Sequence, residues 1–130
     1  MSPTPQRGGF RCVLVIEDDP SLRDYYRAAL QHAGFAAVAV EDGLSALRWL
    51  EQDQPLAVVL DLALPRVSGL DVQQELRGNP ITQQIPIVVV SGNDTSALNP
   101  DEFACILPKP VDADALIDAV QRCLRGPGGA

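Results

Sequence analysis

The chain has 130 residues, of which 46% are apolar and 21% charged, as expected for one globular domain with room for a hydrophobic core. Its formal net charge of -7 and pI of about 4.4 argue against binding of nucleic acid or an anionic membrane, because both need a basic face. No apolar stretch approaches the roughly 18 residues of a membrane span, and the first nine residues lack the apolar core of a secretion signal. We therefore expect a cytoplasmic domain at residues 10–125 with disordered tails at 1–9 and 126–130.

The cysteines and the single histidine do not suggest a catalytic or zinc site. Cys12, Cys105 and Cys123 are odd in number and lack the spacing of metal ligands, so we expect small buried thiols in a reducing compartment. His32 precedes Gly34 at the expected end of a helix, where a cation suits the helix dipole. With one histidine, Ser/His or Cys/His catalysis is not indicated.

Five apolar runs alternate along the chain with segments of helical or turn character. The runs cover residues 11–16, 35–40, 56–60, 87–90 and 104–107. Short runs of Val, Leu and Ile are typical of strands buried on both faces, as in a parallel sheet. Strict alternation of strands and helices predicts an α/β fold with a parallel sheet and helices on both of its faces.

The segments between the runs carry apolar side chains at helical spacing. Helices are expected from Pro20 to before Gly34, from Asp42-Gly43, over 69–77, and from about Asp112 to Leu124. Segment 93–103 is polar and has room for little more than a turn or two of helix. The expected core-facing residues are Leu22, Tyr26, Ala29, Leu30 and Ala33 in the first helix, Leu44, Leu47 and Leu50 in the second, and Ala113, Leu116, Ile117, Val120 and Leu124 in the last.

Two of the apolar runs end in acids, namely Glu17, Asp18 and Asp19 after the first and Asp61 after the third. Ionised carboxylates at the ends of buried strands are costly unless a cation or a donor compensates them. The carboxyl ends of parallel strands meet at one edge of the sheet, so four carboxylates are expected to gather there. Carboxylate oxygens are hard ligands that suit Mg²⁺, and a carboxylate is also a nucleophile for phosphorus.

Ser91 and Lys109 follow the fourth and fifth runs and are expected at the same edge. Lys109 is the only lysine beside nine arginines, and it stands between Pro108 and Pro110, which restrict the backbone. A compact ammonium pairs with a single phosphoryl oxygen as a point charge. Phosphoryl transfer needs positive groups around the equatorial oxygens, and the hydroxyl of Ser91 would add a donor.

These motifs, in this order, resemble the receiver domain of two-component response regulators over about residues 11–124. The matching motifs are VIEDDP at 15–20, DG at 42–43 with AL at 46–47, LDLALP at 60–65 with Gly69, VVVSG at 88–92 and LPKP at 107–110. The resemblance implies a flavodoxin-like, doubly wound sheet of five parallel strands in the order 2-1-3-4-5. It also implies Mg²⁺ as cofactor and a histidine kinase or histidine phosphotransfer protein as phosphoryl donor, with an unknown downstream protein.

The resemblance assigns a role to each residue of the edge. Asp61 would be the phosphoacceptor and a metal ligand, with Ser91 and Lys109 binding phosphoryl oxygens. Asp18 and the backbone carbonyl of Ala63 would ligate the metal directly, and Glu17 through water, whereas Asp19 is not a usual ligand. Such a domain catalyses only its own phosphorylation and dephosphorylation.

The chain also departs from the family pattern. The interval from Ser91 to Lys109 is shorter by roughly one helical turn, and Ile106 and Val111 replace frequent aromatic residues. These changes leave open an atypical receiver that binds proteins without phosphorylation, although the complete set of site residues disfavours it. A Mg²⁺-dependent phosphatase with an aspartate nucleophile is disfavoured, because Ala63 stands where such enzymes carry a second aspartate. A single-domain regulator, a relay shuttle or sink, and a piece of a longer kinase all fit the length.

Overall fold

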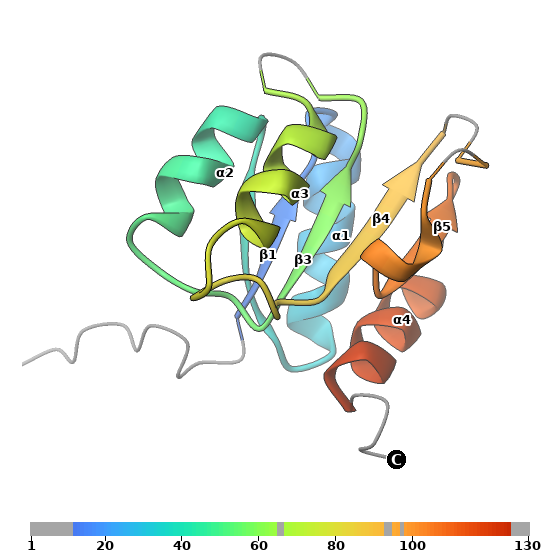
Figure 1. Cartoon of the computed structure of the whole chain (residues 1–130). Coiled ribbons are helices and arrows are strands. Elements are labelled where there is room, and N and C mark those ends of the chain that lie inside the picture. Colours follow the sequence, from blue (N-terminus) through green and yellow to red (C-terminus); the bar gives the residue numbers. More distant parts are fainter. Residues whose placement is uncertain (1–11, 65–66, 93–94, 97, 126–130) are drawn as a thin grey trace, which may run out of the picture.

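The computed structural model describes residues 12–64, 67–92, 95–96 and 98–125, so the predicted tails lie outside the described residues (Figure 1). Its strands are β1 (Cys12–Ile16), β2 (Ala36–Val40), β3 (Ala57–Asp61), β4 (Ile87–Ser91) and β5 (Cys105–Pro108). Its helices are α1 (Pro20–His32), α2 (Gly43–Leu50), α3 (Gly69–Arg77) and α4 (Ala113–Arg125), with one 3₁₀ turn, η1 (Pro100–Glu102). All five strands are parallel in the order β2-β1-β3-β4-β5, which confirms the predicted fold class. Every helix described is too short or too polar to cross a bilayer.

The sheet separates two hydrophobic clusters, because successive side chains of a strand point to opposite faces. Val13 and Val15 of β1 face the cluster beneath α1 and α4, whereas Leu14 and Ile16 face the cluster beneath α2 and α3. Figure 1 shows α2 and α3 in front of the sheet and α1 behind it. On the rear face, the hydroxyl of Tyr25 in α1 accepts a hydrogen bond of 2.8 Å from the backbone N–H of Ala113, which joins α1 to the start of α4.

Burial on both faces is confirmed for the inner strands and is wrong for the two edge strands. All residues of β3 and β4 are buried, and so are the last four of β1. No residue of β2 or β5 is buried, because each of these strands has a neighbour on one side only.

The predicted core face of α2 is partly wrong. Ala46 is fully buried, whereas Leu44, Leu47 and Leu50 are only half-buried. In the eight-residue α2 the buried positions are Gly43 and Ala46, while Leu47 and Leu50 pack half-buried against the cluster beneath α2 and α3. In α4, Ala119 is buried beside the predicted Leu116 and Val120, while Ala113, Ile117 and Leu124 are half-buried.

The segment between β4 and β5 is as short of helix as the sequence predicts. Its described residues contain only η1, whose first turn is capped by Asn99, with the side-chain oxygen accepting the N–H of Asp101 at 3.0 Å. Phe103 then turns into the cluster beneath α2 and α3, where it is 7% exposed. The described part of this segment thus consists of one helical turn followed by a buried aromatic side chain.

The connection from β3 to α3 passes very close to the backbone at the end of β3. A Cβ on Gly69 would lie 2.6 Å from the Cα of Leu62 and 2.7 Å from the carbonyl oxygen of Asp61. The N–H of Gly69 also donates to the Leu62 carbonyl at 3.2 Å. The start of α3 is therefore fixed directly against the last residue of β3.

We expect Gly69→Ala to lower the free energy of unfolding by about 1–3 kcal/mol, because the new methyl group meets backbone that cannot rotate away. Urea unfolding followed by circular dichroism measures this loss. Gly92→Ala is the matched control, since its Cβ would find the Lys109 Cδ at an ordinary 3.8 Å. Equal stability of the two variants would show that the close approach at Gly69 is not a constraint.

Candidate functional site

The carboxyl ends of β1, β3 and β5 bring three carboxylates and one ammonium together. Oxygens of Glu17, Asp18 and Asp61 lie within 4.8 Å of one another. The Nζ of Lys109 lies 3.1 Å from Glu17 Oε1 and 3.4 Å from Asp61 Oδ2. The prediction that these four residues converge at one edge of the sheet is confirmed by these distances.

Glu17 is the most enclosed acid of the cluster, at 1% exposed. Its Oε2 accepts the backbone N–H of Asp19 at 3.2 Å, whereas Oε1 faces Lys109 without a hydrogen bond of good geometry. Burial raises the pKa of Glu17 to about 7, and the Asp61 charge adds to the rise, although the Asp19 N–H and Lys109 act against it. The Asp19 N–H and the Lys109 ammonium therefore offset only part of the cost of burying an ionised Glu17 carboxylate.

Lys109 is fixed from both sides. Its backbone N–H donates to the Ser91 carbonyl at 2.8 Å, which continues the pairing of β4 with β5, and its peptide bond to Pro110 is cis. Burial alone would lower the pKa of Lys109, but the close ion pair with Glu17 and the charge of Asp61 outweigh burial and raise it. The side chain is therefore a cation at neutral pH.

Asp61 is the last residue of β3 and is 4% exposed. Its Oδ1 accepts the backbone N–H of Ala63 at 3.1 Å, while Oδ2 faces Lys109. Both oxygens thus have a donor or a cation beside them, and the carboxylate stands at the end of the strand next to Asp18.

The expectation that four carboxylates gather is wrong for Asp19. Its Oδ1 instead accepts the N–H groups of Ser21 at 2.8 Å and Leu22 at 3.2 Å, which makes it the N-cap of α1. Asp42 has a similar role in α2, where its side chain accepts the N–H of Ser45 at 2.7 Å. The side chain of Asp19 therefore satisfies N–H groups at the start of α1 and is not part of the carboxylate cluster.

Ser91 and Ala63 are the two predicted site residues that the distances above do not include. Ser91 is the last residue of β4 and is 2% exposed, one position beyond Val90, which pairs with Asp61. Ala63 is exposed and lies two residues beyond Asp61. Both are therefore at the predicted edge, and their roles stay predictions.

Sequence reasoning missed two residues near the cluster. The guanidinium Nη1 of Arg23 donates to the backbone carbonyl of Glu17 at 3.1 Å and reaches that of Asp18 at 3.4 Å. Tyr26 was expected only as core, but its buried hydroxyl has no hydrogen-bond partner among the described residues, and burial raises its pKa against the lowering effect of Lys109. A basic residue one turn after the acids was the only sequence signal for Arg23, and none marked the Tyr26 hydroxyl.

The residues present fit a hard divalent cation. Lys109 offsets only one of three neighbouring carboxylates, so negative charge remains at the site. The buried Glu17 Oε1 lacks a hydrogen bond, and an acceptor left in this way is costly unless a donor or a cation supplies it. Three carboxylates without histidine or cysteine form an oxygen-only donor set, which favours Mg²⁺ over zinc.

Comparisons with known proteins agree with this geometry. The family model described as "Response regulator receiver domain" matches residues 13–121. The response regulator MprA of Mycobacterium tuberculosis is 32% identical over 120 residues, and MprA of Mycobacterium leprae is 30% identical. Each alignment covers 87% of this chain and 50% of the relative, so the chain spans about half the length of these relatives.

Solved structures give the same result. A sensor protein from Polaromonas sp. JS666 is 29% identical with a TM-score of 0.81, covering 87% of this chain and 94% of that chain. A CheY-like receiver domain from Methylobacillus flagellatus is 30% identical with a TM-score of 0.77, covering 88% and 98%. The response regulator TrrA of Thermotoga maritima, solved in complex with Mg²⁺-BeF, is 25% identical with a TM-score of 0.77, covering 86% and 97%.

We expect Glu17→Gln to stabilise the metal-free protein at alkaline pH. Because the folded pKa is raised, ionisation of Glu17 opposes folding: the penalty is absent below the ordinary value of 4.5 and complete above about 7. The glutamine variant should be more stable than the parent by on the order of 1 kcal/mol at about pH 8, and equal to it at about pH 4.

Urea unfolding in the presence of a chelator, at both pH values, measures the difference. Glu51→Gln is the control, because it removes one negative charge at an exposed position outside the site. A loss of stability in Glu17→Gln at alkaline pH would mean that pairing with Lys109 outweighs burial.

Proposed function

This chain belongs to the response regulator receiver domain family, and on that premise we propose that it accepts a phosphoryl group on Asp61 and signals through protein contacts. The observation that carries the proposal is the position of the Lys109 ammonium, 3.4 Å from Asp61 Oδ2 at an edge where three carboxylates meet. A nucleophilic carboxylate beside a fixed cation and a hard-metal donor set is what phosphoryl transfer to aspartate requires.

In this proposal Glu17, Asp18, Asp61 and the carbonyl of Ala63 hold Mg²⁺, with Glu17 acting through water. Glu17 Oε1 is buried and ion-paired with Lys109 but accepts no hydrogen bond of good geometry, which supports this assignment because it could still accept from a water. When bound, Mg²⁺ supplies positive charge that offsets the charge on the phosphoryl oxygens. TrrA, solved in complex with Mg²⁺-BeF, supports the same choice of metal for this chain.

The proposed chemistry falls to Asp61. One of its oxygens attacks phosphorus and forms an acyl phosphate, while the bond from phosphorus to the donor breaks and the donor keeps the electron pair. With a phosphohistidine donor the broken bond is P–N, and the leaving imidazole takes a proton from water. Lys109 then pairs with one phosphoryl oxygen and the hydroxyl of Ser91 donates to another.

The phosphoryl donor is proposed to be a histidine kinase or a histidine phosphotransfer protein. His32, the only histidine of these 130 residues, is exposed at the end of α1 and belongs to none of the strand ends, so the proposed donor histidine lies outside this sequence. The relatives named response regulator MprA support a signalling role for this chain. They are about twice as long as the chain, so the proposal names no downstream protein.

Incubation with Mg²⁺ and a small acyl phosphate should give a single phosphoryl adduct by intact mass, and Asp61→Asn should give none. Asn removes the nucleophile while keeping the size of the side chain. Asp101→Asn, at an exposed position in η1, is the control for loss of one charge and should phosphorylate normally. An adduct that persists in Asp61→Asn would place the acceptor elsewhere.

Removal of the metal should stop this reaction. A chelator should abolish the adduct in the parent, and Asp18→Asn should require at least about tenfold more Mg²⁺ for half-maximal phosphorylation, because a charged ligand becomes neutral. Titration of the initial phosphorylation rate with Mg²⁺ measures this shift. An unchanged Mg²⁺ dependence in Asp18→Asn would remove that residue from the metal site.

The second candidate is a receiver that binds partners without phosphorylation. The observation in its favour is the replacement of a helix by η1 between β4 and β5, where the described residues contain no other helical turn. Absence of any Asp61-dependent adduct, in a protein shown by circular dichroism to be folded, would favour this candidate.

A further inference from the structure

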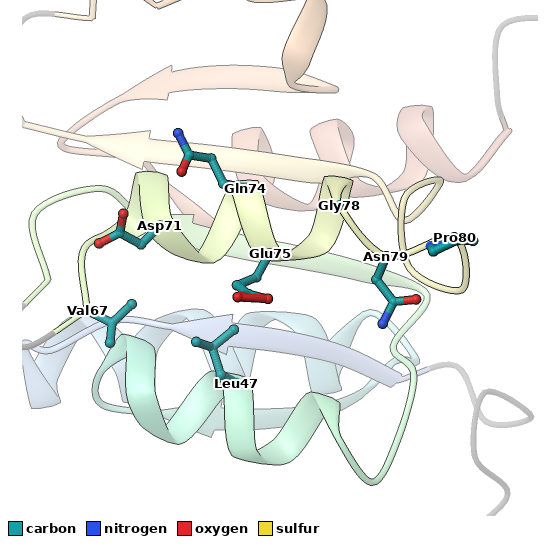
Figure 2. A pocket seen from close by; sticks show the side chains of 8 residues that line it. All are labelled: Leu47, Val67, Asp71, Gln74, Glu75, Gly78, Asn79 and Pro80. Atoms are coloured by element: carbon teal, nitrogen blue, oxygen red, sulfur yellow. The ribbon is translucent and has the colours of Figure 1, made fainter.

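A groove of about 720 Å³ lies between α2 and α3, away from the carboxylate cluster (Figure 2). Leu47 of α2 lines one side of it, and Val67, Asp71 and Glu75 line the other. A smaller hollow of about 220 Å³ shares Leu47 and Glu75 and extends the surface to Leu50 and Glu51 of α2. We call these six residues together the α2–α3 groove.

Three of the six residues of the α2–α3 groove are apolar. Leu47, Leu50 and Val67 are only half-buried, although all three pack against the hydrophobic cluster beneath α2 and α3. Figure 2 shows Leu47 and Val67 on the side of α3 that faces α2. Beside the smaller hollow, Ile81 is 66% exposed, which is the highest value among the large apolar side chains described. Partly exposed apolar side chains that border a hollow offer a contact surface for another protein.

The rim of the α2–α3 groove is acidic. Glu51, Asp71 and Glu75 are exposed, and no lysine or arginine is present among the described residues that line the two hollows. In Figure 2 the side chain of Glu75 extends from α3 toward α2, above Leu47. The carboxylates of Asp71 and Glu75 form no ion pair or side-chain hydrogen bond within the described part of the chain, so their charge is available to a partner.

A second copy of this chain is poorly suited to fill the groove, because most of its described cations are already engaged. The engaged residues are Arg23 and Arg77 on backbone carbonyls, Arg27 and Arg122 in ion pairs with Asp24 and Asp118, and Lys109 in the carboxylate cluster. Arg48 lies on α2 itself, and the whole chain carries a net charge of -7. Charge complementarity therefore indicates a different, basic protein.

We propose that the α2–α3 groove docks a basic amphipathic helix of a partner protein. Apolar side chains on one face of that helix contact Leu47, Leu50 and Val67, while its lysines and arginines pair with Glu51, Asp71 and Glu75. α2 and α3 have eight and nine residues, which correspond to about 12–14 Å, so the docked segment has about two to three turns. This is the helix-in-groove mode of recognition, with the acidic rim setting specificity and association rate.

The proposed docking goes beyond phosphoryl acceptance and is separable from it. None of the groove residues belongs to the cluster of Glu17, Asp18, Asp61 and Lys109. A variant can therefore lose one property and keep the other, which distinguishes failure of this inference from failure of the proposed function.

The test uses a labelled synthetic helix of about fourteen residues, with leucines on one face and lysines on the other. A twin peptide carries glutamate in place of every lysine. Fluorescence anisotropy with the full, unphosphorylated chain measures affinity at low and high salt, and amide NMR shifts locate the bound peptide. We expect the lysine peptide to bind with a salt-sensitive affinity and to shift amides of α2 and α3, and the glutamate peptide not to bind.

The variant pair Asp71→Asn with Glu75→Gln should weaken binding by at least about fivefold, because two rim charges are lost. The matched pair Asp101→Asn with Asp114→Asn removes two exposed charges outside the groove and should change affinity by less than about twofold. Asp61→Asn should bind the peptide as the parent does. No binding, equal weakening by the two pairs, or amide shifts confined to other elements would each overturn the proposal.

Discussion

The contact of Lys109 with both Glu17 and Asp61 is the interaction on which the site depends. Parallel strands end at one edge, so the acids after β1 and β3 are forced together whatever their charges. One ammonium at 3.1 and 3.4 Å from two buried carboxylates offsets part of that repulsion, and the pairing of β5 with β4 fixes its position. The excess negative charge that remains is the physical basis of the proposed metal site, so the fold and the proposed chemistry share one cause.

The other acids near the edge stabilise the elements that carry the cluster. Asp19 caps α1 and Asp42 caps α2, each by accepting N–H groups that a helix start leaves unpaired. Two neighbouring aspartates therefore have different roles: Asp18 belongs to the carboxylate cluster, whereas Asp19 caps α1. The difference comes from backbone direction at the strand end, which decides whether a carboxylate meets N–H groups or other carboxylates.

The sequence predicts the sheet well, because buried parallel strands need continuous apolar runs and the five runs in this chain match the five strands. It predicts the convergence of Glu17, Asp18, Asp61 and Lys109 for the same reason, since strand ends share an edge. The sequence does not predict two details. In α2 the fully buried residue is Ala46 whereas Leu47 is half-buried, and Asp19 caps α1 and is not part of the carboxylate cluster. The contacts of Arg23 with the backbone carbonyls of Glu17 and Asp18 have only a weak signal in the sequence, a basic residue one turn after the acids.

Two features of the structure border the same helix, α3. On one flank of α3, the half-buried Leu47 and Leu50 of α2 border the α2–α3 groove. On the other flank, a hollow of about 570 Å³ lies between α3 and η1. Gln74 lines the hollows on both sides. Since Gly69 fixes the start of α3 against the carbonyl of Asp61, α3 links the end of β3 to the hollows on its two flanks. Within the described part of the β4–β5 segment η1 is the one helical element, so α3 is bordered by a hollow toward α2 and by another toward η1, and both of its flanks offer surface for protein contacts.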